Sequence, residues 1–301
     1  MKKELVILTA VLSVSAFSAM STSAVDALSV KHNPGLRLPY RTSLIAEFQN
    51  LGLSPRAQGK RDTCSLFAIT ALAEFEYAKN NPAPPTPFSE EFLIWAVNRT
   101  RRVTKDRAKF DEAVRGLNAF GISSEEMMPY ASTHDPGRKP SSAAIKDARS
   151  RKGRWKAFWI KRWNPKTPLS EPQILAIKKA LASGHPVACG LRWPKSQKGH
   201  QLLEVPPSSR VFDGHSIVFV GYEDKPKQLG GGVFLFRNSN GPHWGNKGYG
   251  TMSYAYACAY ANDALWLQLR PRQSQAAAKG FETGNVRPER RSAQPPLHGS
   301  R

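Results

Sequence analysis

The fold of this chain is decided by the stretch Gln58-Gly59-Lys60-Arg61-Asp62-Thr63-Cys64-Ser65-Leu66-Phe67-Ala68. Asp62 and Thr63 offer side-chain oxygens that cap a helix, and an apolar-rich run continues to Phe75. The pattern therefore predicts a helix whose first turn holds Cys64. Unpaired backbone N–H groups and the helix dipole stabilise negative charge at such a position, so Cys64 is a candidate nucleophile.

Further helices and then strands are predicted along the chain. Ser89 caps one helix, and another runs from Phe110 to Phe120. From about Trp155 the sequence changes toward strands, interrupted by a helix that Ser170 caps. The predicted strands are Trp155–Trp163, Pro186–Trp193, His215–Tyr222 and Val233–Arg237. Helices first and strands later indicate an α+β protein with segregated lobes.

Two later motifs supply partners for a cysteine nucleophile. Gly214–Tyr222 places His215 at the head of an apolar strand, and Asn238–Tyr249 opens with Asn238. Cleavage of an amide by a thiol needs a base, a group that orients the base, and donors for the oxyanion. His215 suits the base better than the other histidines, which lie in turns, near the termini or inside the asparagine motif.

Together these stretches resemble the nucleophile, histidine and asparagine motifs of papain-like cysteine peptidases. The match keeps the family's order and extends from Gln58 to Leu267. The resemblance implies that Cys64 attacks the substrate carbonyl, that His215 exchanges the proton, and that Asn238 orients the imidazole. It also implies that the Gln58 side chain and the Cys64 backbone N–H hold the oxyanion.

The resemblance further implies a two-lobe α+β fold. A helical N-terminal lobe and an antiparallel, β-rich C-terminal lobe are expected to enclose the active-site cleft between them. The expected segments are a signal peptide at 1–24, an N-terminal extension at 25–57, a helical lobe with the nucleophile helix at 58–154, a β-rich lobe with the histidine and asparagine at 155–270, and a flexible basic tail at 271–301.

Three positions depart from the family pattern. Arg61 stands where relatives usually have a disulfide-forming cysteine, and Ser65 replaces the tryptophan that commonly follows the nucleophile. Asn240 replaces a tryptophan that shields the family's histidine–asparagine pair, so we expect a wetter and weaker hydrogen bond between the imidazole and Asn238. The family's substrate-binding glycine pair has no counterpart, which leaves the specificity pockets unassigned.

The spacing between the motifs is longer than is usual in the family. His215 lies 151 positions after Cys64 (215 − 64) and Asn238 lies 174 positions after it (238 − 64). Inserted basic loops are therefore expected near Arg138–Arg154 and Lys195–Ser209. If these loops flank the cleft, their charge favours acidic substrates.

The first residues predict export. A charged start precedes an apolar run from Leu5 to Ala19 and then small residues, as in a secretory signal peptide. We expect a secreted or periplasmic protein with no transmembrane anchor after cleavage and without a long inhibitory propeptide. Since the chain has three cysteines, at least one thiol stays free even if Cys189 pairs with Cys258.

The net charge of +21 attracts anionic partners. Besides a protein or peptide substrate, we expect an anionic polymer of the cell envelope as a second partner. No zinc-finger spacing, RNA-binding signature or heptad zipper occurs, so no specific nucleic-acid partner is predicted. Neither a cofactor nor a metal is expected, because no pair of histidines or cysteines has ligand spacing.

Three other functions stay open at this point. The chain could be a papain-like pseudoenzyme that binds peptides or envelope partners without cleaving them. It could instead use Cys64 as an acyltransferase or as an amidase on cell-wall peptides. A third alternative is an anionic-polymer binder in which the aromatic and basic segment Arg151–Trp163 stacks on bases.

Overall fold

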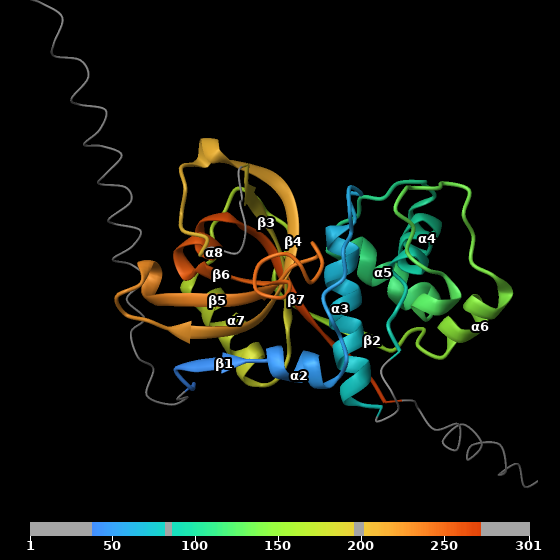
Figure 1. Ribbon diagram of the computed structural model, residues 1–301, viewed down its shortest axis with the longest axis horizontal. Helices are drawn as coiled ribbons and strands as arrows, with labels where there is room; N and C mark the ends of the chain where they lie inside the picture. The colour runs from blue at the N-terminus through green and yellow to red at the C-terminus, as the bar shows by residue number, and fades with distance from the viewer. Residues whose placement is uncertain (1–37, 82–85, 196–201, 272–301) are drawn as a thin grey trace, which may run out of the picture. The chain divides into compact units, whose positions relative to one another are not determined.

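The structure is a computed structural model that describes residues 38–81, 86–195 and 202–271 of the 301-residue chain. The chain divides into two units after Arg270, and the fold lies in the first unit. There, helices gather on one side of a long central helix and an antiparallel sheet lies on the other (Figure 1). The expected signal peptide, and the expected tail beyond Pro271, lie outside the described residues.

Local sequence signals explain the helices of the first lobe, which are α4 (Glu90–Arg101), α5 (Phe110–Phe120) and α6 (Ser142–Arg149). The Ser89 hydroxyl accepts the Phe92 N–H at the start of α4, as predicted. Gly116 lets α5 approach α4 closely, because a Cβ there would lie 2.9 Å from the Val97 side chain. The predicted bounds of α5 are confirmed.

The β-rich lobe is built on a seven-stranded sheet in the order β2-β7-β3-β4-β5-β6, with β1 paired to β4. All pairs are antiparallel. This confirms the predicted fold class, and the sheet brings His215 beside β3, opposite Leu191. The strands are β1 (Arg41–Ser43), β2 (Trp155–Lys161), β3 (Val187–Pro194), β4 (Val211–Asp224), β5 (Gly232–Arg237), β6 (Tyr249–Ser253) and β7 (Ala261–Leu269).

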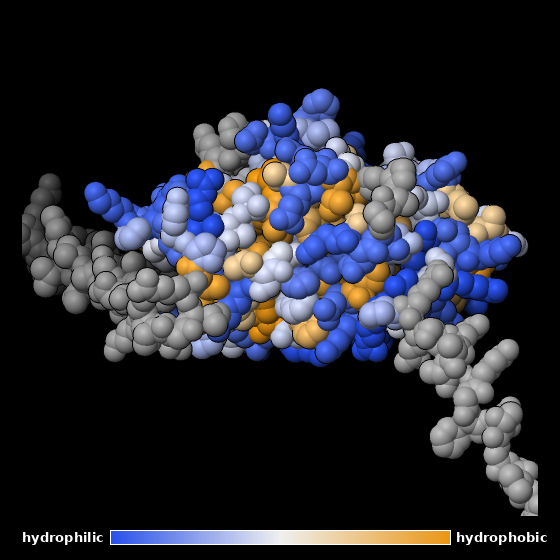
Figure 2. All heavy atoms as spheres, turned by 90° about the horizontal axis from the view of Figure 1, so that it is seen from below, coloured by the Kyte–Doolittle hydropathy of each residue, from blue (hydrophilic) through white to orange (hydrophobic). Residues whose placement is uncertain are grey.

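Helices also cover parts of the sheet. In α7 (Glu171–Ala182), Ser170 and Gln173 form the predicted capping box, and the helix packs against β4 and β2. The remaining helices and short 3₁₀ turns are α2 (Ile45–Asn50), α8 (Tyr254–Tyr260), η1 (Glu125–Met127), η2 (Ser208–Arg210) and η3 (Leu229–Gly231). Hydrophilic residues predominate on the face seen in Figure 2, with apolar patches among them.

The central helix is α3 (Cys64–Lys79), and it joins the two lobes. Its sequence is apolar on every side, and twelve of its sixteen residues are buried. A helix without a polar face has to be enclosed, and α3 packs against α4 and α5 on one side and β3, β4 and β7 on the other. This position sets the first turn of α3, and with it Cys64, at the junction between the lobes.

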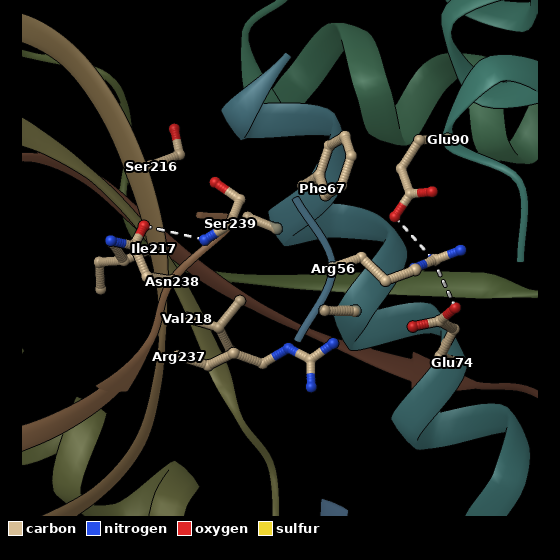
Figure 3. Close-up of a pocket in the computed structure, with 12 residues that line it drawn as sticks. Arg56, Phe67, Glu74, Glu90, Ser216, Ile217, Val218, Arg237, Asn238 and Ser239 are labelled. Atoms are coloured by element: carbon tan, nitrogen blue, oxygen red, sulfur yellow. Dashed lines mark hydrogen bonds and ion pairs between the residues drawn. The ribbon is translucent and has the colours of Figure 1, made fainter. Parts of the chain in front are cut away.

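A buried ionic cluster lies beneath that junction. Arg56 binds Glu74 at 2.7 Å and Glu90 at 2.6 Å (Figure 3). The second terminal nitrogen of its guanidinium lies 3.5 Å from Glu125. Arg56, Glu74 and Glu90 line a small cavity of about 20 Å³ that also touches Asn238. Burial raises the pKa of Glu90 well above its usual value, and the carboxylates of Glu74 and Glu125 add to this shift, although Arg56 opposes it.

The region around Arg138–Arg154 corrects the expectation of a basic loop beside the cleft. It contains α6, which lies at the edge of the helical lobe farthest from the sheet (Figure 1). Ala144 and Ala148 bury the inner face of α6 against Phe92 and Met128. Because only two alanines of α6 are buried, its sequence shows almost no hydrophobic periodicity, and the helix was not predicted.

Candidate active site

Cys64 opens α3 at the edge of a cleft between the lobes. The cleft has a volume of about 810 Å³, and Gln58, Cys64 and His215 all line it. As the first residue of the helix, Cys64 has a backbone N–H without an intrahelical acceptor. Thr63 precedes it but does not cap the helix through its side chain, because the Thr63 hydroxyl pairs with the Tyr130 hydroxyl at 2.8 Å.

The thiol lies against the residues on both sides of His215. The Cys64 Sγ–H donates to the Gly214 carbonyl, 3.7 Å away, and hydrogen bonds with Ser216 favour the thiolate. Burial has the larger effect, and the pKa of Cys64 is raised above its usual value. Ser216 is a residue of the site that sequence reasoning missed, because a serine inside an apolar strand carries no distinctive signal.

Asn238 orients the imidazole from the end of β5. His215 Nε2 lies 2.8 Å from Asn238 Oδ1. The backbone N–H of Ser239 donates to the same oxygen at 2.8 Å, as Figure 3 shows. Two donors on one atom identify it as the carbonyl oxygen, so Nε2 carries the proton and Nδ1 is left for the cleft. Burial lowers the pKa of His215 to about 4, and the bond to Asn238 opposes this shift.

The pKa shifts favour a neutral thiol and a neutral imidazole. The sequence suggested instead a thiolate stabilised by the helix N-terminus. The difference arises because each charge alone loses hydration in the cleft. A thiolate and an imidazolium formed together would attract each other, so any proton transfer from Cys64 to His215 would be one coupled step and not two separate ionisations.

The imidazole is shielded by Trp193 of β3. The two rings meet edge to face, with centroids 4.5 Å apart and planes inclined by 63°. Trp193 is buried, as is Asn238, which is only 3% exposed. This corrects the expectation that Asn240 exposes the bond between His215 and Asn238 to solvent. The shielding indole comes from another strand instead, because β3 changes register between Leu191 and Trp193.

Gln58 is tied to the loop that follows Asn238. Its Nε2 donates to the Arg61 carbonyl at 2.7 Å, and its Oε1 accepts the Ser239 hydroxyl at 2.5 Å. Its backbone N–H also donates to the Ser239 carbonyl at 2.8 Å. An amide nitrogen has two protons, so one N–H of Gln58, a residue that lines the cleft together with Cys64, is not used by the bond to Arg61.

Arg61 holds the nucleophile loop with charge in place of the family's disulfide. Its guanidinium binds both oxygens of Glu91, at 2.7 and 3.3 Å, and both oxygens of Asp106, at 2.6 and 3.0 Å. It also donates to the Ala131 carbonyl at 2.7 Å. Burial opposes the charge, but the bonds to Asp106 and Glu91 raise the pKa of Arg61 above its usual value.

Basic side chains do line the cleft, but they come from an unexpected segment. The described residues of the two expected loops do not line it. The cationic lining residues besides Arg61 are Lys60, Arg101, Lys105, Arg107 and Lys109. Two of these are neutralised locally, because Arg107 pairs with Asp62 and Arg101 with Glu112. Their charge therefore contributes less to the cleft than the sequence suggested.

Asp263 is a buried acid in the same cleft. It lies opposite Gly190, where a Cβ would stand 2.2 Å from its Oδ1, so only glycine fits. Burial raises the pKa of Asp263 to about 7, although a hydrogen bond from the Gly190 backbone opposes the shift. Sequence reasoning missed this residue because it lies in β7, which was not predicted.

The other cysteines do not pair. Cys64, Cys189 and Cys258 are all free thiols. Cys189 is fully buried in β3, and Cys258 donates to the Leu169 carbonyl at 3.1 Å. In the described residues, no group of three or more potential ligands is placed to hold a metal ion. Nor does that part of the chain contain a helix long and apolar enough to cross a membrane.

Comparison with known proteins defines the class of this chain. Residues 53–267 match the model of the papain family of cysteine proteases, and the chain belongs to this family. The fold is similar to that of xylellain, a cysteine protease from Xylella fastidiosa, with a TM-score of 0.65 and 22% identity over 82% of this chain and 89% of that one. Digestive procathepsin L 3 of Tenebrio molitor has a TM-score of 0.58 and 19% identity, covering 79% of this chain and 72% of that one.

A curated relative is an uncharacterized peptidase C1-like protein of Acanthamoeba polyphaga mimivirus. It is 26% identical over 219 residues, which make up 68% of this chain. The match spans 65% of that relative's length. The family and the fold of this chain are therefore those of papain-like cysteine proteases.

Proposed function

We propose that this protein is a cysteine endopeptidase that hydrolyses peptide bonds through an acyl-enzyme intermediate. The observation that carries the proposal is the 2.8 Å bond from His215 Nε2 to Asn238 Oδ1, with the Cys64 thiol held between Gly214 and Ser216. This arrangement leaves the free edge of the imidazole for the sulfur. Cys64, His215 and Ser216 line one cleft of about 810 Å³, large enough for a peptide, and Asn238 contacts His215 from behind this lining.

The proposed reaction begins with transfer of the Cys64 proton to His215 Nδ1. The sulfur then forms a bond to the substrate carbonyl carbon, and the C=O electron pair moves onto oxygen. The Cys64 backbone N–H and the free N–H of Gln58 stabilise that oxyanion. Losing one such donor typically costs about a hundredfold or more in rate.

Breakdown of the intermediate completes the cycle. The carbon–nitrogen bond breaks, and His215 returns its proton to the leaving amine. Water then gives a proton to His215 and attacks the thioester, which releases the carboxylic acid and restores the thiol. Throughout, Asn238 keeps the imidazole in one orientation and one tautomer.

Labelling of the thiol tests this proposal against a pseudoenzyme. A peptide-based, thiol-directed inhibitor is expected to label the wild-type protein once, at Cys64, and the His215→Ala variant at least a hundredfold more slowly. Cys258→Ala is the matched control, since Cys258 is also partly exposed and should not affect labelling. Labelling that persists in Cys64→Ala, or that is equally fast in His215→Ala, would contradict the proposal.

Product analysis separates hydrolysis from the other acyl-transfer reactions. A peptidase should give two peptide fragments from a protein substrate, with one new carboxylate for each new amine. Transfer to an added amine would indicate an acyltransferase, and cleavage confined to cell-wall peptides would indicate an amidase. The open, charged cleft favours an extended polypeptide, which is why we place hydrolysis of proteins first.

We also propose that the protein works outside the cytoplasm. The apolar run from Leu5 to Ala19 supports this, because it follows a charged start and precedes small residues, as in a secretory signal peptide. Expression of the full chain in a bacterial host should yield a mature N-terminus between Ser21 and Ala27. An unprocessed, cell-associated product would argue against export.

A further inference from the structure

We propose that a second concave site, on the helical lobe, binds an acidic stretch of polypeptide. This helical-lobe pocket has a volume of about 400 Å³ and is separate from the cleft that holds Cys64. It is formed by α4, by the turn that ends α4, and by the loop between Met128 and Lys139. That the bound polypeptide is a segment of the substrate rests on the proposed peptidase function. That the pocket binds an acidic polypeptide does not depend on that function.

Four cationic side chains converge on the pocket: Arg99, Arg102, Arg138 and Lys139. Arg99, Arg102 and Lys139 are exposed and have no acidic partner in the described part of the chain. Of the two acids in the lining, Asp135 accepts the Gly137 N–H of its own loop at 2.8 Å. The other, Glu91, is occupied by Arg61. Four cations therefore face two carboxylates in the lining, one of which is already paired with Arg61, and the pocket wall keeps a net positive charge that is available to a ligand.

One residue of the pocket, Arg102, has a backbone conformation that non-glycine residues disfavour. Arg102 ends α4 in a left-handed conformation, with φ of 56°, where glycine is usual and other residues cost about 1 kcal/mol. Its N–H nevertheless donates to the Asn98 carbonyl and closes the helix. Glycine would suit this backbone conformation better, yet the chain has an arginine here, and the Arg102 side chain lines the pocket.

The apolar part of the lining narrows the class of ligand. Ile94, Trp95, Val103 and Met128 contribute apolar surface beside the cations. Trp95 is held edge to face by Phe120, with centroids 5.0 Å apart, and stays partly exposed. A site with both indole surface and guanidinium groups fits a peptide with acidic and apolar side chains better than a uniformly charged polymer.

The pocket is anchored to the nucleophile loop through shared carboxylates. Glu91 Oε2 lies 2.7 Å from Arg61 and 3.8 Å from Arg138 of the pocket. Asp106 Oδ1 lies 2.6 Å from Arg61 and 2.8 Å from His134 of the pocket. The pocket therefore has a fixed position relative to the cleft, and a substrate that reaches both sites gains affinity through its effective concentration.

Binding to an inactive protein tests the pocket without depending on catalysis. The probe is a fluorescent peptide of six glutamates and two leucines, titrated by anisotropy into Cys64→Ala protein. Adding Arg99→Gln and Arg102→Gly should weaken binding about tenfold, equivalent to about 1.4 kcal/mol. Since φ at position 102 suits glycine, that variant should fold at least as stably as the parent. Lys146→Gln removes an exposed charge from α6, outside the pocket, and should change affinity less than twofold.

A second arm measures turnover by protein with an intact Cys64. A substrate that carries the same glutamate stretch should have a lower KM than its glutamine counterpart, at equal kcat, and the Arg99→Gln, Arg102→Gly variant should abolish that difference. Equal weakening by Lys146→Gln would overturn the proposal, as would preferential binding of a sulfated polysaccharide or single-stranded DNA over the peptide. If the chain lacks peptidase activity, the binding result stands alone and the two proposals are judged separately.

Discussion

His215 illustrates how a single residue sets the working pH of the site. Its pKa is lowered to about 4 by burial, and only the neutral imidazole can accept the Cys64 proton. We therefore expect kcat/KM to rise with pH through about 4 and to level off above it. Since the bond to Asn238 raises the pKa of His215, Asn238→Ala should move this limb to lower pH and lower the rate about a hundredfold.

The measurement is the pH dependence of kcat/KM together with that of the alkylation rate. Asn240→Ala is the matched control, because Asn240 lies two residues further along the same loop and is exposed. A limb near the ordinary histidine pKa of about 6.5, unmoved by Asn238→Ala, would contradict the geometry described for this pair.

At this scale the sequence identified the residues with a motif and missed those without one. Gln58, Cys64, His215 and Asn238 belong to recognisable stretches, and the structure places three of them on one cleft and the fourth in contact with His215. Ser216 follows His215 within its motif but carries no signal of its own, and Trp193 and Asp263 reach the site only through strand pairing. Without the register of β3 against β4 and β7, nothing in the sequence links them to Cys64.

Among the structural elements, the loop before α3 depends most on charge. Replacing Arg61 with methionine keeps much of its volume but leaves Glu91 buried without its partner. We expect the free energy of unfolding to fall by about 3 to 5 kcal/mol. Activity should fall as well, because a loop that is no longer held by the Arg61 side chain shifts the Arg61 carbonyl, to which the Gln58 side chain donates. Denaturation by urea measures the first effect.

Arg107→Gln is the control for this prediction. Arg107 makes an ion pair of the same 2.7 Å length with Asp62, but the two side chains are 81% and 65% exposed. Removing it should cost less than about 1 kcal/mol, since solvent screens such pairs. Similar losses in the two variants would show that burial of the Arg61 pairs adds nothing.

Elements with strong local signals were predicted well, and those that depend on tertiary contacts were not. Caps and a glycine stop located α4, α5 and α7 from the sequence. By contrast, β7 was not foreseen, although it pairs with both β2 and β3 in the sheet. Its sequence, Ala261–Leu269, follows α8 directly, and the small and polar residues at its start hide the strand.

For the whole molecule, the buried ionic cluster makes the joint between the lobes sensitive to pH. Because the folded pKa of Glu90 exceeds its ordinary value of 4.5, the native state keeps this proton at pH values where the unfolded chain has lost it. The stabilisation is therefore complete below pH 4.5 and is lost as pH rises. Up to the folded pKa, the loss is about 1.4 kcal/mol per pH unit.

The Glu90→Gln variant tests this statement, because glutamine stays neutral. Its free energy of unfolding relative to wild type should increase between pH 4.5 and pH 7.5, as measured by urea denaturation. Glu126→Gln is the control, since Glu126 is exposed and lies outside the cluster. Parallel stability curves for wild type and Glu90→Gln would refute the role of this carboxyl group.

The two-lobe architecture was predicted because the order of helices and strands along the chain reflects their segregation in space. The charge distribution was not, since the sequence does not say which basic segments face one another. Residues Arg99 to Lys109 illustrate this, because Arg101, Lys105, Arg107 and Lys109 line the cleft while Arg99 and Arg102 face the helical-lobe pocket. The spacing of these basic residues along the sequence does not show which of them face the cleft and which face the helical-lobe pocket.

The guanidinium clamp of Arg61 has a practical consequence for how such an enzyme withstands reductants. A cysteine nucleophile needs a reducing agent to stay active, and the same agent loosens any protein whose loops are tied by sulfur–sulfur bonds. The described part of this chain contains no disulfide bond that a reductant could break, because its three thiols are all free. We expect its melting temperature to be the same with and without dithiothreitol, so the agent that keeps the nucleophile active leaves the scaffold intact.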